Sequence, residues 1–261
     1  TRDSRIRLTP GQITGNGPCN TFAATNAATL PQISVSVMNW TDNPCGHKGF
    51  EGRFFEALTQ ATEAGTVYTP DEIAALAQVA RSYALPVHMD GARFANAVAR
   101  LGCSPADLTW RAGVDVLSFG ATKNGALAAE AVVFFKPELA RSFAFHRKRA
   151  GHLFSKMRFL SAQLDAYLEG GLWLRLATHA NAMADRLAAG LAALPGADLR
   201  DPVEANEIFI SLPEPVTAGL LERGYAFYRW DGPVVRLVTA WNTSAEDVDR
   251  MIADARALAK S

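Results

Sequence analysis

The stretch DVLSFGATKNG, residues 115–125, ends an apolar run with a single lysine among very small residues. We expect residues 114–119 to form a buried strand, with Lys123 delivered just beyond its carboxyl end. Small neighbours leave room for a planar group to approach the amine, and partial burial favours the neutral, nucleophilic form of an amine. Taken alone, the stretch fits better a surface lysine in a glycine-rich turn.

A second polar motif, HMDGAR, occupies residues 88–93. Side chains alternate along a strand, so His88 and Asp90 are expected on the same face. Ligands of parallel α/β sheets bind at the carboxyl ends of strands, where Asp90 could hold a cation. Arg93 could present its planar fork to an anionic oxygen. The alternative, that Asp90 caps a helix starting near Ala92, stays open.

The surrounding pattern predicts an α/β fold. Strand and helix alternate up to residue 135, which predicts a mostly parallel sheet with flanking helices. The elements expected there are a helix at 69–85 capped by Thr69, a strand at 86–90, a helix at 92–102 that ends at Gly102, and buried strands at 114–119 and 131–135. A helical stretch at 137–168 follows and connects to a small α+β C-terminal domain. The expected elements of that domain are a helix at 173–194, strands at 207–212, 225–230 and 234–239, and a helix at 245–260.

Residues 1–57 differ in character from the rest. They are rich in Asn, Thr, Gly and Pro and show no clear helical or strand period. GNGPCN, residues 15–20, could be a phosphate-binding turn before a helix-like stretch at 21–30, although ordinary loop chemistry explains it as well. We therefore expect an atypical N-terminal segment at 1–57, a large cofactor-binding domain with a connecting helix at 58–168, and a small domain at 169–261.

Composition excludes several classes of protein. The 26 basic and 26 acidic side chains balance, so no overall charge favours nucleic acid or an anionic membrane. No apolar run reaches the roughly 18 residues of a membrane span, and no secretory signal is evident. Three scattered cysteines, without a CxxC or HExxH spacing, suit a reducing cytoplasm and predict no metal site.

Asp90 and Lys123 carry more information together than separately, because each closes a predicted parallel strand. A lysine that forms a Schiff base and an aspartate that pairs with a pyridinium nitrogen are the minimum requirement for pyridoxal phosphate. The carboxylate keeps the ring nitrogen protonated, so that the ring can accept electrons from a substrate carbanion.

Three segments resemble the threonine aldolase family: VHMDGARFANAVARLG (87–102), DVLSFGATKNG (115–125) and the helical region 146–191. The resemblance extends from about residue 58 to the C-terminus. It implies pyridoxal-phosphate fold type I, the aspartate-aminotransferase fold, and a relationship to the aromatic amino acid β-eliminating lyases.

The resemblance also implies roles for individual residues. Lys123 would bind pyridoxal 5'-phosphate covalently, Asp90 would pair with its ring nitrogen, and Arg93 would contact its ring oxygen. Arg236 would bind the substrate carboxylate, with an ordinary strand arginine as the alternative.

Lys156 and Arg158 resemble basic residues that family members offer to the cofactor phosphate, sometimes across a subunit interface. A homodimer or homotetramer is therefore expected, with a small amino acid as substrate and neither nucleic acid nor membrane as partner.

The implied reaction is retro-aldol cleavage of a β-hydroxy-α-amino acid, of threonine or allo-threonine type, to glycine and an aldehyde. A β-eliminating lyase or an aminotransferase of the same fold is one alternative. A catalytically impaired homologue with a structural or assembly role is another, because residues 1–57 show no recognisable phosphate loop. RLTPGQI (7–13) resembles the linker that follows that loop in the family.

Overall fold

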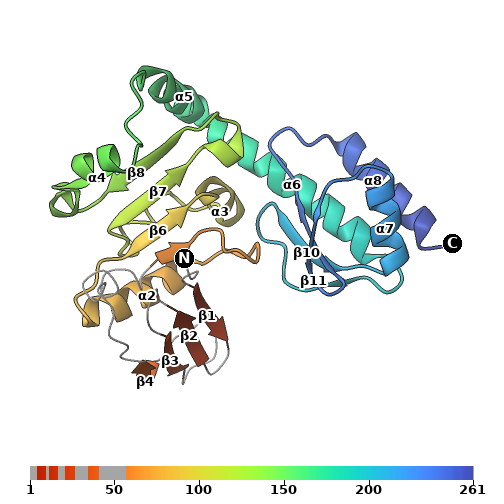
Figure 1. The fold of residues 1–261 in the computed structure, drawn as a ribbon, viewed down its shortest axis with the longest axis horizontal. Helices are drawn as coiled ribbons and strands as arrows, with labels where there is room; N and C mark the ends of the chain where they lie inside the picture. Colours follow the sequence, from red (N-terminus) through yellow and green to blue (C-terminus); the bar gives the residue numbers. More distant parts are fainter. Residues whose placement is uncertain (1–4, 10–11, 17–20, 27–34, 41–56, 261) are drawn as a thin grey trace.

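The computed structural model describes residues 5–9, 12–16, 21–26, 35–40 and 57–260, and its strands form three four-stranded sheets (Figure 1). The first sheet is antiparallel throughout, in the order β1-β2-β3-β4. Its strands are β1 (Arg5–Thr9), β2 (Gln12–Asn16), β3 (Thr21–Asn26) and β4 (Val35–Trp40).

Two interpretations of the N-terminal segment are wrong. The segment does contain regular strands, although its sequence shows no clear period. Residues 21–26 form a strand and not the start of a helix. Within 7–13, residues 7–9 and 12–13 belong to the paired strands β1 and β2 and not to a linker. GNGPCN therefore leads into a strand and not into a helix N-terminus, and its residues 17–20 lie outside the described ranges. Pairing partners several residues away, which periodicity does not capture, determine these strands.

The second sheet has the order β5-β6-β7-β8 and contains the motifs that the sequence singles out. Its strands are β5 (Ala57–Thr59), β6 (His88–Gly91), β7 (Val116–Gly120) and β8 (Glu130–Phe134). The pairs β5–β6 and β6–β7 are parallel, as predicted, but β7–β8 is antiparallel. The connection 121–129 is too short for a parallel return, which needs about a dozen residues or more.

One face of this sheet is deeply buried. Met89, Leu117 and Phe119 join a core that includes residues of α2 (Pro70–Ser82) and α3 (Phe94–Leu101). The expectation that 131–135 is a buried strand is wrong, because β8 lies at the edge of the sheet, where Val132 and Val133 are exposed.

The ends of α2 and α3 follow from local sequence. Thr69 caps α2 in a capping box, in which its hydroxyl accepts from the Glu72 backbone N–H while the Glu72 carboxylate accepts from the Thr69 N–H. Gly102 ends α3 with a φ of 62°, a left-handed conformation that favours glycine. Both features agree with the sequence-based expectation.

The single helical stretch expected at 137–168 is instead divided. It consists of η2 (Pro137–Ala140), α4 (Phe143–Arg149) and α5 (Arg158–Leu168). Gly151, with a φ of 76°, lies in the turn after α4 and takes a conformation incompatible with a continuous helix.

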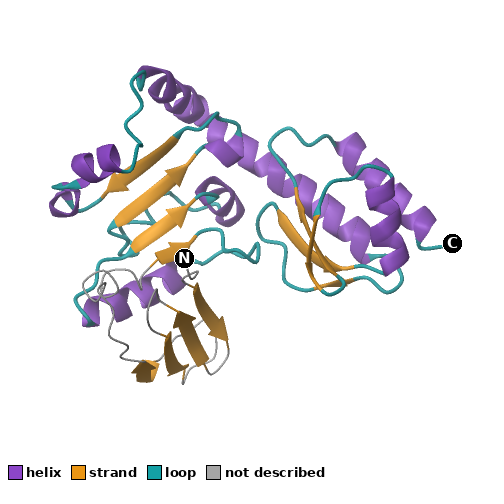
Figure 2. Cartoon of the chain, viewed as in Figure 1, coloured by secondary structure: helices purple, strands orange, loops and turns teal. Residues whose placement is uncertain are grey.

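The third sheet, in the order β11-β12-β10-β9, is antiparallel and packs with three helices around a second core (Figure 2). The elements are α6 (Leu172–Ala192), β9 (Asp198–Leu199), β10 (Glu207–Ser211), α7 (Glu214–Glu222), β11 (Tyr228–Asp231), β12 (Val234–Val238) and α8 (Ala245–Leu258). The sequence predicted these elements apart from β9 and α7. We refer to the parts around the two cores as the large lobe and the small lobe.

Helix α6 contributes to both cores. Trp173 and Ala177 near its start pack in the large lobe, whereas Leu187 and Leu191 near its end pack in the small lobe. The domain boundary at 168/169 remains a prediction, since one helix serves both lobes.

Two further observations concern the described residues only. Among their helices, none combines the length and the apolar character needed to cross a membrane. Within the same ranges, no group of three His, Cys, Asp or Glu side chains is placed to hold a metal ion.

Thr69→Ala is expected to destabilise the chain by about 1 kcal/mol, because one N–H group at the start of α2 loses its acceptor. Urea unfolding followed by circular dichroism measures the change. Ser82→Ala is the matched control at the other end of the helix, where the exposed hydroxyl donates only to the Val79 carbonyl. Equal destabilisation by both substitutions would contradict the role of the cap.

Candidate active site

The candidate site lies where β6 and β7 end side by side. In their parallel register Asp90 is opposite Ser118, and Gly91 is opposite Phe119. A Cβ added to Gly120 would lie 2.8 Å from Ala92 Cα and 3.0 Å from the Ala92 carbonyl oxygen. Glycine is therefore needed at position 120 to let the two chain segments lie close together. The absence of a side chain at this position thus serves backbone packing, and the expectation that small neighbours leave room beside Lys123 remains a prediction.

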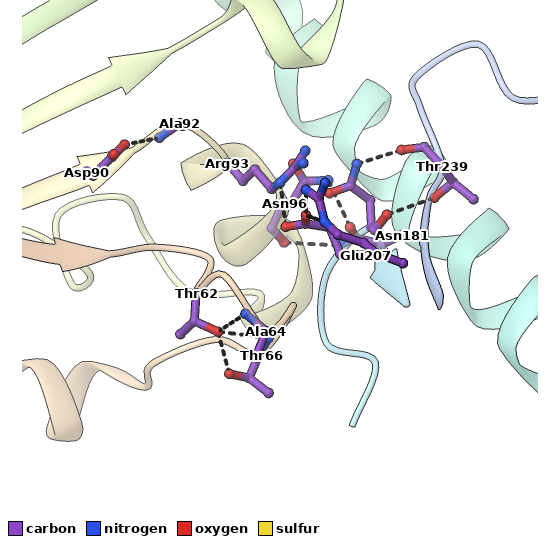
Figure 3. Close-up of polar contacts among 12 residues, drawn as sticks. Thr62, Ala64, Thr66, Asp90, Ala92, Arg93, Asn96, Asn181, Glu207 and Thr239 are labelled. Atoms are coloured by element: carbon purple, nitrogen blue, oxygen red, sulfur yellow. Dashed lines mark hydrogen bonds and ion pairs between the residues drawn. The ribbon is translucent and has the colours of Figure 1, made fainter. Parts of the chain in front are cut away.

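Asp90 turns the chain at the end of β6 (Figure 3). Its Oδ1 accepts from the Ala92 backbone N–H at 3.0 Å, two residues along the chain. The helix-cap alternative is not supported, because α3 begins at Phe94 with Arg93 in the N-cap position. Among the described residues, none donates to Asp90 Oδ2, so this oxygen is available to a ligand.

Lys123 lies in the 3₁₀ turn η1 (Thr122–Asn124) that follows β7. Its neighbour Asn124 is buried and donates to the Tyr167 hydroxyl at 2.7 Å and to the Trp173 carbonyl at 2.9 Å. Gly125 closes the turn with a φ of 108°. The turn is thus anchored by Asn124, which the sequence analysis overlooked.

The side chain of Lys123 is exposed. Within the described part of the chain, this position corrects the expectation of a partly buried amine. The exposed amine and the available oxygen of Asp90 stand at the same edge of the sheet, where a planar cofactor could contact both.

Arg93 and Arg236 meet at one buried carboxylate, that of Glu207. Figure 3 shows Arg93 beside Glu207. Arg93 Nε lies 2.6 Å from Glu207 Oε2, and Arg236 Nε donates to Glu207 Oε1 at 3.0 Å. Arg236 Nη2 also contacts Oε1. The exposed side-chain fractions are 10% for Arg93, 22% for Arg236 and 3% for Glu207. Arg236 is therefore a paired, partly buried side chain and not an ordinary surface arginine.

The backbone around Glu207 is held from several sides. The preceding residue, Asn206, donates to the Thr239 carbonyl and accepts from the Thr239 N–H. The Thr239 hydroxyl donates to the Ala180 carbonyl of α6 at 2.7 Å. On the other side, Gly65 approaches so closely that an added Cβ would lie 2.8 Å from the Glu207 carbonyl oxygen.

Sequence reasoning missed Glu207. The available signal was a charged residue at the start of the apolar run EIFISL. A charge that is expected to enter a core requires a partner, and such a partner is rarely visible in the local sequence.

Lys156 and Arg158 lie away from this group. Both are exposed, and Arg158 begins α5, where its guanidinium carbon is 4.7 Å from the Phe159 ring centroid. No contact within the described part of the chain joins either residue to Asp90, Arg93 or Lys123. Their assignment to a cofactor phosphate remains a prediction.

His88 shares the open face of β6 with Asp90, as the alternation predicted. Its Nε2 lies 2.9 Å from Ser118 Oγ. Burial lowers the pKa of His88, and the charge of Asp90 opposes this effect in part. A neutral imidazole therefore borders the Asp90 carboxylate near neutral pH.

Two family models match the chain in different regions. The model described as beta-eliminating lyase matches residues 55–214, and the model described as META domain matches residues 1–71. The first match contains the strands, turns and helices that carry Asp90, Lys123, Arg93 and Glu207.

Individual proteins agree with the first match. The low specificity L-threonine aldolase of Pseudomonas aeruginosa is 50% identical over 200 residues, which are 76% of this chain and 58% of that protein. The threonine aldolase structure from Leishmania major aligns with a TM-score of 0.73 and 28% identity, over 78% of this chain and 60% of that chain.

Serine palmitoyltransferase from Sphingomonas wittichii aligns with a TM-score of 0.60 and 15% identity, over 78% of this chain and 54% of that chain, and shows likeness of fold alone. Together these matches confirm fold type I and the family resemblance found in the motifs. The chain spans somewhat more than half the length of the curated relative it matches.

Asp90→Asn is expected to lower the pKa of His88 further, because the opposing attraction of the carboxylate is removed. An NMR titration of the imidazole carbons measures the pKa, which in the unaltered chain should already lie below 6.5. The folded state then takes up the His88 proton less readily than the unfolded chain. Stability is therefore expected to fall as the pH drops below about 6.5.

Asp107→Asn serves as the control for this titration, because Asp107 is tied to Ser104 and Arg111 on another part of the surface. It should leave the His88 titration unchanged. A rise in the pKa of His88 in Asp90→Asn would contradict the electrostatic assignment.

Proposed function

We propose that this chain cleaves a β-hydroxy-α-amino acid of threonine type to glycine and an aldehyde. The chain belongs to the beta-eliminating lyase family and is similar to threonine aldolases. The cofactor is pyridoxal 5'-phosphate. The single observation that carries the proposal is the placement of the Asp90 carboxylate and the Lys123 amine at the ends of two adjacent strands, each with a group available to a ligand.

The donor set fits this cofactor in two respects. Pyridoxal phosphate needs an amine for its aldehyde carbon and an acid for its ring nitrogen, and Lys123 and Asp90 supply these groups. One carboxylate oxygen of Asp90 accepts from the Ala92 N–H in the turn, and the other is assigned to the ring nitrogen. We assign the phosphate to Lys156 and Arg158, from the same subunit or a neighbouring one, on the strength of the family resemblance alone.

Arg236 is assigned to the α-carboxylate of the substrate. Glu207 occupies the Nε and Nη2 side of its guanidinium, and within the described residues Nη1 has no acceptor. A carboxylate approaching the Nη1/Nη2 end would find the paired N–H groups that such ions prefer. Trp230, whose ring centroid is 5.9 Å from the guanidinium carbon, flanks this group.

The residues divide the remaining work by position. When bound, the cofactor would accept the electron pair released as a base removes the β-hydroxyl proton and the Cα–Cβ bond breaks. The Asp90 carboxylate holds the proton on the ring nitrogen, so that this electron pair is stabilised. The Lys123 amine is placed to return a proton to Cα, and Arg236 fixes the substrate by its carboxylate. β-Elimination or transamination would use the same groups but would yield a keto acid.

A second candidate is an assembly subunit without catalytic activity. The observation that favours it is the match of residues 1–71 to a META domain, together with the partial coverage of the aldolase relatives. Such a chain would keep the fold and Lys123 and yet bind cofactor weakly. For either candidate, the free thiol of Cys103 and the scattered cysteines of the sequence favour the cytoplasm.

Addition of pyridoxal phosphate to the purified chain is expected to produce an absorption band near the edge of the visible range, which Lys123→Ala abolishes. Lys260→Ala, an equally exposed lysine at the end of the small lobe, should keep the band. Incubation with L-threonine should release glycine and acetaldehyde, measured by chromatography and a coupled dehydrogenase assay. Absence of the band from the folded chain would refute the enzyme, whereas a keto acid product would refute the aldolase.

The chain is expected to form a dimer or tetramer, since the proposed phosphate ligands reach across subunits in the family. Light scattering coupled to size exclusion measures the mass. A monodisperse monomer that still binds pyridoxal phosphate tightly would contradict the shared site.

A further inference from the structure

We infer that Glu207 is a positioning residue that orients both Arg93 and Arg236 toward the ligands proposed for them. The inference rests on the proposed function for the identity of those ligands, and it deepens that function by adding a residue. Glu207 itself is 3% exposed and contacts the two arginines from its place at the start of β10.

The two oxygens of Glu207 are divided between the two lobes. Oε2 pairs with Arg93, which precedes α3 in the large lobe, and Oε1 pairs with Arg236 on β12 in the small lobe. In each arginine the Nε atom takes part, so each guanidinium is held on its side edge. In Arg236, Nη1 has no acceptor among the described residues, so this end of the guanidinium is left for a ligand.

Charge supports the same conclusion. One carboxylate faces two guanidinium groups, so the group retains one excess positive charge among side chains that are mostly buried. Incompletely neutralised buried charge is costly, and a bound monoanion would complete the neutralisation. The α-carboxylate of an amino acid has this charge and matches the geometry of an arginine end.

Other contacts between the lobes do not involve Glu207. Asn96 on α3 and Asn181 on α6 exchange hydrogen bonds of 2.9 and 3.0 Å. Arg100 on α3 makes a bidentate pair with Asp185 on α6. Because these pairs hold the lobes together, loss of the Glu207 charge should change the orientation of the Arg93 and Arg236 side chains without unfolding the chain.

Glu207→Gln is the principal test in the chain loaded with pyridoxal phosphate. We expect KM for L-threonine to rise at least about tenfold while kcat changes less than about threefold, because Arg236 loses its orientation and the reacting groups stay in place. Glu204→Gln is the matched control. Glu204 lies three residues earlier and accepts from the Val67 N–H through its carboxylate, a bond that a carboxamide keeps.

Glu207→Asp keeps the negative charge on a shorter side chain. Its KM for L-threonine should therefore lie between that of the unaltered chain and that of Glu207→Gln. It also carries the test if Glu207→Gln does not fold, since KM should still rise several-fold. The inference would be overturned if every folded Glu207 variant had a KM for L-threonine within twofold of that of the unaltered chain. A decrease in kcat without a change in KM would also overturn it.

A double variant separates positioning from general loosening. If Glu207 acts on the substrate through Arg236, then Glu207→Gln combined with Arg236→Lys should have the same KM as Arg236→Lys alone. If the increase in KM of the double variant equals the product of the two single increases, Glu207 does not act through Arg236, and the inference would be overturned.

A binding measurement without cofactor or turnover completes the test. Propionate, a simple monoanion, should shift the arginine Nε–Hε NMR signals of Arg93 and Arg236 in a saturable way. These signals are identified by their loss in Arg93→Lys and Arg236→Lys. In Glu207→Gln the affinity for propionate should fall at least about tenfold, and in Glu204→Gln this affinity should not change.

Absence of saturation in the unaltered chain, or equal affinity in Glu207→Gln, would overturn the inference. A positive propionate result without an absorption band from pyridoxal phosphate would instead refute the proposed enzyme and keep the role of Glu207. The two failures are therefore distinguishable.

Discussion

The pairing of α3 with α6 is the contact on which the geometry of the candidate site depends. Asn96 and Arg100 stand one turn apart on α3, and their partners Asn181 and Asp185 stand one turn apart on α6, so the two helices meet in a single register. The exposed Arg100–Asp185 pair contributes at most about 1 kcal/mol, whereas an unpaired buried amide costs about 1–3 kcal/mol. The asparagine pair therefore specifies the register. Arg93 lies one residue before α3, and this register brings it within reach of Glu207.

Local sequence signals predict much of the fold, and contacts between distant residues account for the errors. Thr69, Glu72 and Gly102 determine helix ends through bonds made within a few residues, so their effects are visible in the sequence. The direction of β8 depends on the length of the turn at 121–129, and its exposure depends on its place at the edge of the sheet. Neither property is encoded in the apolar run itself. The N-terminal strands likewise depend on pairing between segments that show no period.

The same distinction holds at the site. The positions of Asp90 and Lys123 at neighbouring strand ends could be predicted, because one lies near the end of an apolar strand and the other just after one, and parallel strands bring their carboxyl ends together. The need for glycine at position 120 could not be predicted, because the backbone that crowds this position belongs to Ala92, almost thirty residues earlier. Glu207 was out of reach for a similar reason, because its partners Arg93 and Arg236 come from two other elements. Local patterns locate polar residues at strand ends, whereas contacts between distant residues become visible only in three dimensions.

Helix α6 has a consequence for how the molecule unfolds. Its 21 residues extend for about 32 Å and leave no break between the part packed in the large lobe and the part packed in the small lobe. If either core melts, half of α6 loses the apolar contacts that stabilise it, and an isolated helix of the remaining length is marginal in water. Melting of one lobe thus weakens the helix on which the other lobe is built. The two cores are separate in space, but their stabilities are thermodynamically coupled through a single element of secondary structure.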